Sequence, residues 1–106
     1  MAMDLNKLMK QAQEMQDQMA KAQEELKNET VEASAGGGMV TVKATGALEI
    51  LEIKIAAEAI DPSDPDLLAD MVTAAVNEAL RSAQSLVESK LGSAMGGLQG
   101  LGLPGM

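Results

Sequence analysis

The sequence predicts an α+β domain in which two long helices flank a three-stranded antiparallel sheet. Three observations lead to this fold class. An unbroken apolar heptad runs through the first 28 residues, alternating apolar and polar residues interrupted by glycines occupy the centre, and an alanine-rich apolar stripe follows Pro65. The expected order is helix, strand, strand, strand, helix, within a single domain that spans residues 4–92.

The first helix is expected over residues 4–28. Its apolar residues recur in alternating steps of three and four, which is the spacing of a packed helix pair; they are Leu5, Leu8, Ala12, Met15, Met19, Ala22 and Leu26. Such a helix is roughly 37 Å long, whereas a six-residue strand rises only about 20 Å. Because the helix outruns any sheet this chain can form, the uncovered stripe predicts an oligomer with projecting helical arms.

The centre of the chain predicts a β-hairpin. Residues 30–35 and 39–45 both alternate, and the apolar positions place Val31, Ala33 and Ala35 on one face of the first strand and Val40, Val42 and Ala44 on one face of the second. The glycines at 36–38 lie between the two strands and supply the turn. They are expected to form a flexible loop.

A third strand is expected over residues 48–55, after a turn at Gly46 and Ala47. The alternation changes phase at Ile50 and Leu51, which indicates either a β-bulge or a strand that is buried on both faces. The outward positions of the sheet are polar. The three strands are therefore expected to form an antiparallel meander that is solvated on one face and covered by helices on the other.

The second helix is expected over residues 65–91. Asp64 suits the N-cap position, Pro65 suits the first helical position, and Gly92 is expected to end the helix. Its inward stripe is rich in alanine, which permits close approach of another element; it consists of Leu68, Met71, Val72, Ala75, Ala79, Ala83 and Leu86.

The last segment, residues 93–106, is rich in glycine and is expected to be disordered. Its leucines, Leu98, Leu101 and Leu103, could dock on a partner, but the composition favours a frayed end.

The composition argues against catalysis. The chain has no His, Cys, Trp, Tyr or Phe, so imidazole bases, thiolate nucleophiles and the usual transition-metal ligands are missing. Neither Ser nor the carboxylates fall in a known catalytic spacing. We therefore expect a protein that is not an enzyme, with no catalytic residue, metal site, cofactor or small-molecule substrate. A small hydrolase that uses Ser and carboxylates is the remaining catalytic alternative.

The N-terminal sequence carries no basic-then-apolar signal pattern, and no apolar run approaches the length of a membrane span. A cysteine-free chain is compatible with the cytoplasm. The net charge is −8 per chain, and hence −16 for two chains, which repels polyanions at long range. Any contact with a nucleic acid must therefore come from a local basic patch.

Four short motifs, taken in order, resemble the YbaB/EbfC family of bacterial nucleoid-associated proteins. They are residues 6–16 (NKLMKQAQEMQ), 36–40 (GGGMV), 61–62 (DP) and 74–79 (AAVNEA). The resemblance covers residues 4–92, and a glycine-rich tail is also typical of the family. It implies a homodimer whose helices project like the arms of tweezers and bind double-stranded DNA with little sequence preference, in the nucleoid of the bacterial cytoplasm.

Five basic residues are the candidates for DNA contact. Lys7, Lys10 and Lys21 fall on one stripe of the first helix, opposite the heptad, where they are spaced for phosphate contacts. Arg81 and Lys90 lie on the second helix. With one arginine and no aromatic residue, sequence-specific recognition is poorly supported, so we expect salt-sensitive backbone contact.

Two alternatives remain for these residues. Each lysine of the first helix has an acidic residue three or four positions away, which could make the stripe a salt-bridged solvated face; the pairs are Lys7 with Asp4, Lys10 with Glu14, Lys21 with Asp17 and Lys27 with Glu24. The second alternative is an acidic helical module that binds another protein and not DNA.

Overall fold

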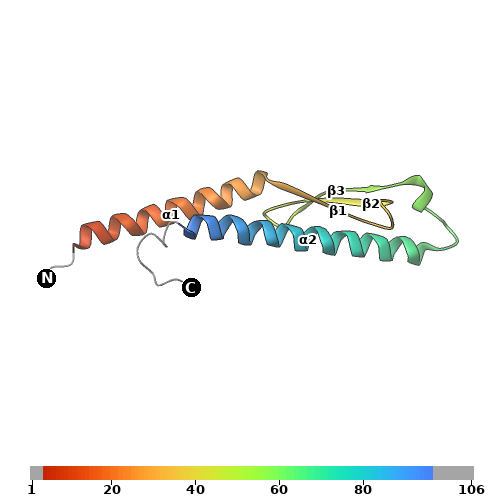
Figure 1. Cartoon of the computed structure of the whole chain (residues 1–106). Coiled ribbons are helices and arrows are strands. Elements are labelled where there is room, and N and C mark those ends of the chain that lie inside the picture. Colours follow the sequence, from red (N-terminus) through yellow and green to blue (C-terminus); the bar gives the residue numbers. More distant parts are fainter. Residues whose placement is uncertain (1–3, 97–106) are drawn as a thin grey trace.

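The computed structural model describes residues 4–96 and confirms the predicted order of elements (Figure 1). They are α1 (Leu5–Asn28), β1 (Thr30–Ala35), β2 (Val40–Thr45), β3 (Ile50–Ile55), a short 3₁₀ helix η1 (Ala57–Ala59) and α2 (Pro65–Gly96). The molecule is an elongated rod with extents of 76 × 25 × 16 Å. Figure 1 shows why: the sheet lies beside one half of α2, and α1 projects past the other end of α2.

Helix α1 begins at an N-cap, because Oδ1 of Asp4 accepts the backbone N–H of Lys7 at 3.2 Å. The helix ends at Asn28, where the backbone N–H of Glu29 bonds to the carbonyl of Leu26. Only the last two residues of its heptad, Ala22 and Leu26, are buried. Ala22 lines a hollow with Ser93 and Ala94, and Leu26 lines another with Val87 and Leu91. In this region α1 runs antiparallel to the end of α2 (Figure 1). Within this chain, the predicted helix pair therefore covers only the C-terminal part of the heptad.

Strands β1 and β2 form the predicted hairpin. Their antiparallel register pairs Thr30 with Thr45 and Ala35 with Val40. Gly36, Gly37 and Gly38 all have positive φ angles of 64°, 66° and 91°, a conformation that L-amino acids adopt reluctantly. Three consecutive glycines are therefore what lets the two strands meet in register here.

The connection from β2 to β3 is built around Thr45. Its buried hydroxyl accepts the backbone N–H of Ala47 at 3.1 Å and of Glu49 at 3.4 Å. Leu48 within this turn has a φ of 63°, which ends regular pairing, so β3 begins at Ile50 and not at residue 48. The register shifts where Ala44 pairs with Ile50, which confirms the predicted bulge.

Helix α2 starts as predicted, since Asp64 Oδ1 accepts the backbone N–H of Leu67 at 3.2 Å and Pro65 occupies the first position. The predicted end at Gly92 is wrong, because the helix continues to Gly96. Glycine in a helix interior costs about 1 kcal/mol relative to alanine, a penalty that a long helix tolerates. Gly92 is also exposed, so a missing side chain forfeits no core packing.

The core is a thin layer between α2 and two strands. Val40, Val42 and Ala44 of β2 are fully buried, and the facing residues of α2, namely Ala75, Ala79 and Ala83, are fully buried as well. Small alanine side chains bring the helix close to the sheet. The predicted inward faces of β1, β2 and α2 are therefore confirmed, although α2 alone covers the sheet and α1 barely touches it.

Strand β3 departs most from expectation. The prediction offered burial on both faces as one explanation of its pattern, yet all six residues are exposed. Helix α2 packs on β1 and β2 and does not extend over β3. Ile53 pairs with the buried Val42, and Ile55 with the buried Val40. Paired residues share a face of the sheet, so these isoleucines continue the core face beyond the helix that covers it.

Candidate nucleic-acid interface

Lys7, Lys10 and Lys21 all lie on exposed positions of α1. Eleven residues separate Lys10 from Lys21, which is close to three whole turns and about 16 Å along the axis. Helix geometry therefore places the three ammonium groups along one side of the arm. Within residues 4–96, none of the three has a carboxylate within 4.0 Å.

Of the four ion pairs that the sequence offered along the first helix, only one forms within residues 4–96: Lys27 Nζ lies 3.5 Å from Glu24 Oε2. Asp4, the proposed neighbour of Lys7, instead directs its carboxylate to a backbone N–H as the N-cap. The first three turns of the arm thus present lysines that other side chains of the described chain do not neutralise.

The charge of the chain is unevenly distributed. Helix α1 holds four lysines and four acidic residues, so its net charge is zero, and the whole −8 rests on the remainder of the chain. From Leu5 to Gln13, Lys7 and Lys10 are the only charged residues. The first turns of α1 therefore carry a local positive charge within an acidic chain.

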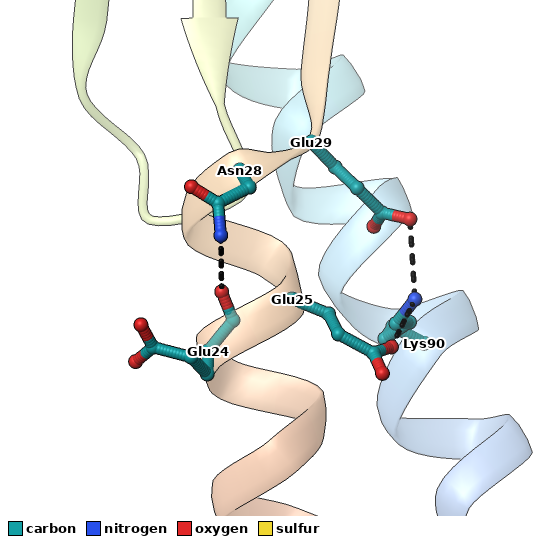
Figure 2. A network of polar contacts seen from close by, with 5 residues as sticks. All are labelled: Glu24, Glu25, Asn28, Glu29 and Lys90. Carbon is teal, nitrogen blue, oxygen red and sulfur yellow. Dashed lines mark hydrogen bonds and ion pairs between the residues drawn. The ribbon is translucent and has the colours of Figure 1, made fainter.

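Lys90 occupies a different environment, between the two helices (Figure 2). Its Nζ lies 2.8 Å from Glu25 Oε2 and 3.1 Å from Glu29 Oε1, and its side chain is only 25% exposed. Glu29 also caps α1 and accepts the backbone N–H of Gly46 through its carbonyl. Lys90 thus ties the end of α1 to α2 next to the turn that follows β2.

These contacts shift the protonation equilibria of both partners. The hydrogen bond and charge of Lys90 lower the pKa of Glu25 below its ordinary value. The hydrogen bonds of Glu25 and Glu29 raise the pKa of Lys90. Glu25 and Lys90 are therefore both ionised over the whole neutral range. The second carboxylate oxygen of Glu29, Oε2, is buried without a hydrogen-bond partner within the described residues.

Arg81 lies on the exposed side of α2, where Nη2 contacts Glu78 Oε2 at 2.8 Å. Its Nε donates to the same oxygen at 3.2 Å. Both side chains are more than half exposed, so the pair is a solvated local one. The structure does not gather Arg81 with the lysines of α1, because Arg81 lies on the part of α2 whose buried residues Ala79 and Ala83 belong to the core shared with β2.

An open hollow of about 500 Å³ marks the place where the arm leaves α2. Lys21 and Glu25 line it from α1, and Lys90 and Ser93 from α2. Residues 4–96 contain no group of three or more His, Cys, Asp or Glu side chains arranged to hold a metal ion. Over the same part of the chain, no helix has both the length and the apolar character needed to span a membrane.

Comparison with known proteins matches residues 1–98 to a family model described as the YbaB/EbfC DNA-binding family. The chain belongs to the YbaB/EbfC DNA-binding family. The resemblance inferred from the four sequence motifs is thereby confirmed, and it covers both the arm and the sheet.

Bacterial relatives within the YbaB/EbfC family match nearly the whole chain. A nucleoid-associated protein of Acetivibrio thermocellus is 53% identical over 103 residues, covering 97% of this chain and 89% of the relative. A nucleoid-associated protein of Pelotomaculum thermopropionicum is 48% identical, covering 97% and 95% respectively. The crystal structure of an uncharacterized protein from Helicobacter pylori aligns with a TM-score of 0.72 at 20% identity, covering 83% of this chain and 92% of that one. This last likeness supports the fold.

Sequence patterns in this YbaB/EbfC chain did not reveal Glu25 and Glu29 as partners of Lys90. Lys90 and Glu29 are 61 residues apart, so no helical spacing connects them. The available signal was weak: an acidic pair at the end of one helix and an isolated lysine near the end of the other. Only the antiparallel packing of the two helices brings them together.

Proposed function

We propose that the protein binds double-stranded DNA through the phosphate backbone, with little sequence preference, and that Lys7, Lys10 and Lys21 make the principal contacts. The observation that carries the proposal is the position of these lysines on one exposed side of a projecting helix, with no ion pair to the described residues. Ammonium groups that are already solvated can contact phosphates without breaking a protein salt bridge.

Arg81 and Lys90 take lesser parts in this proposal. Arg81 must leave Glu78 before it can reach a phosphate, and this exposed pair is weak enough to exchange. Lys90 is held by two carboxylates and is mostly shielded from solvent. Its proposed role is to position the arm, and DNA contact through Lys90 is the least favoured of the five.

The proposal includes a homodimer joined through β3. Ile50, Ile53 and Ile55 form an exposed apolar row, and the strand also presents an unpaired edge. Such an edge favours pairing with a second strand, and the isoleucines favour burial against a second core. In a dimer of this kind the two α1 helices serve as the arms of the tweezers, and the protein acts at the bacterial nucleoid by bridging or regulating DNA.

The test is fluorescence anisotropy of a labelled duplex of random sequence, titrated with protein between about 50 and 200 mM salt. Each phosphate contact contributes about 0.9 to the slope of log affinity against log salt, or roughly a 3.5-fold loss of affinity per contact over that range. A protein with Lys7→Gln and Lys10→Gln should therefore bind more weakly and show a shallower slope.

The matched control is Lys54→Gln with Lys43→Gln, which removes the same charge from the sheet. If both pairs of substitutions weaken binding equally, net charge and not the arm determines the affinity. If the wild-type protein fails to bind even at the lower salt concentration, the DNA-binding proposal is wrong. The alternative, an acidic helical module that binds another protein, is then favoured.

A further inference from the structure

Most of the α1 heptad has no partner in the described chain. Leu5 is 68% exposed, Leu8 44% and Met15 41%, whereas Ala22 and Leu26 of the same stripe are buried. The change occurs at the hollow where Ser93 and Ala94 face the helix. Beyond that point, the stripe continues for two heptads with the spacing of a helix-pairing seam but without a second helix.

The positions that flank this exposed stripe carry no charge. In the heptad that places Leu5 and Leu8 at the seam, the flanking residues between Leu5 and Met19 are Met9, Gln11, Gln16 and Gln18. The charged residues of the same stretch, Lys7, Lys10, Glu14 and Asp17, fall on the opposite side of the helix. The arm therefore has one neutral apolar side and one charged side.

The separation of α1 into a neutral apolar side and a charged side indicates which partner can bind the apolar side. A copy of a chain with a charge of −8 repels another copy across most of its surface, but the neutral stripe carries no such repulsion. Knobs-into-holes packing also requires a helical partner with the same repeat. Within residues 4–96, the free stripe of α1 is itself the helix that meets both conditions.

We propose that the exposed stripe of α1 pairs with the same stripe of a second copy of the chain. Paired arms direct Lys7 and Lys10 outward, so the contact leaves the proposed DNA-binding side free.

The contact is short, and its strength follows from its length. Two heptads fall below the three or four that sustain an independent coiled coil. The pairing therefore adds little when copies are dilute and becomes effective when copies are held close together, as on a shared duplex. The surface belongs to the protein whether or not DNA is its ligand, so its test is separate from that of the proposed function.

The experiment uses the absence of native cysteine, which makes single cysteines clean probes. Ala12→Cys places a thiol within the stripe, and Ala20→Cys places one on the outer side of the same helix; both positions are exposed. A short bifunctional maleimide is applied to the full chain, free and bound to duplex. The two-chain product should be several-fold more abundant for Ala12→Cys, and equal yields overturn the proposal.

A second substitution excludes chance collision. In the Ala12→Cys protein, Met15→Glu puts a carboxylate into the stripe, whereas Gln13→Glu adds the same charge on the outer side. Cross-linking should fall several-fold with Met15→Glu and stay unchanged with Gln13→Glu. A protein with both Ala12→Cys and Leu101→Cys tests whether the chain's own C-terminal segment occupies the stripe. A cross-linked product with the mass of one chain would show that it does and would overturn the proposal.

Discussion

The ammonium of Lys90 lies 2.8 Å from a carboxylate oxygen of Glu25 and joins the last third of α2 to the last turns of α1 (Figure 2). Glu29 adds a second carboxylate to the same ammonium at 3.1 Å. Because α1 touches the sheet so little, this cluster and the buried Ala22 and Leu26 are the main connections between the arm and the body. The direction of the arm therefore depends on a small number of side chains.

We expect the pair Lys90 and Glu25 to show energetic coupling. Lys90→Gln leaves two carboxylates facing each other without a cation, so it should lower the melting temperature more than Glu25→Gln does. In the Lys90→Gln background, Glu25→Gln should cost little or even stabilise. Thermal unfolding of the double-mutant cycle measures this coupling. The exposed pair Lys27 and Glu24 is the control, and a coupling no larger than that of the control would contradict a positioning role for Lys90.

The same pair predicts a dependence of stability on pH. Lys90 lowers the pKa of Glu25 from its ordinary value of 4.5. The carboxylate therefore contributes stability that is present above pH 4.5 and is lost as the pH falls through the lowered value. The difference in melting temperature between wild type and Glu25→Gln should stay constant near neutrality and shrink on acidification below pH 4.5. A difference that persists unchanged in strong acid would assign the effect to packing.

At alkaline pH the prediction has the opposite direction. Glu25 and Glu29 raise the pKa of Lys90 above its ordinary value of 10.5. Its contribution is complete below pH 10.5 and is lost as the pH rises through the raised value. Wild type should therefore lose stability faster than Lys90→Gln above that pH, as measured by thermal unfolding in alkaline buffers.

Gly46 should tolerate alanine less well than Gly37 does. A Cβ at Gly46 would lie 2.6 Å from the backbone oxygen of Leu26, so α1 or the turn must shift. A Cβ at Gly37 meets nothing within 4 Å, and only its positive φ of 66° opposes the change. We expect a cost of about 1 kcal/mol at Gly37 and about 2–3 kcal/mol at Gly46.

Far-ultraviolet circular dichroism is the appropriate measurement for this comparison, because the chain has no aromatic residue to report on unfolding by fluorescence. Denaturant midpoints of Gly46→Ala and Gly37→Ala give the two free energies. Equal losses of unfolding free energy would mean that α1 shifts near Leu26 at no measurable cost.

The proposed dimer predicts a specific effect at β3. Ile53→Lys puts a charge into the exposed isoleucine row and should convert the dimer to a monomer, as read by light scattering. Leu67→Lys on α2 is the control, because Leu67 is also exposed but lies outside the row. Persistence of the dimer in the Ile53→Lys protein would move the interface away from β3.

The sequence was sufficient for the elements whose signals are local. Asp64 and Pro65 gave the start of α2, the three glycines gave the first hairpin, and the change of phase at Ile50 and Leu51 gave the bulge. Each of these depends on backbone preferences of a few adjacent residues. The predicted end of α2 at Gly92 was wrong, because a single glycine costs a long helix only a modest free-energy penalty and does not terminate it.

The features that the sequence missed depend on contacts between distant segments. An apolar strand pattern at β3 indicates burial but does not say whether the cover comes from the same chain or from another. Acidic neighbours of Lys7, Lys10 and Lys21 indicated ion pairs, whereas Lys90 formed the closest bridge between separate elements with residues more than sixty positions away. Residue spacing can identify possible partners, but packing decides which contacts form.

The alanine and valine core described above has a calorimetric consequence. Its fully buried side chains are small, and Val40 and Val42 are the largest of them, so unfolding a single chain exposes little apolar surface. The heat capacity of unfolding scales with that surface, so it should fall below the usual value of about 12–15 cal/mol/K per residue. A small heat capacity change flattens the stability curve, and the protein should keep a nearly constant free energy of unfolding across a broad temperature range.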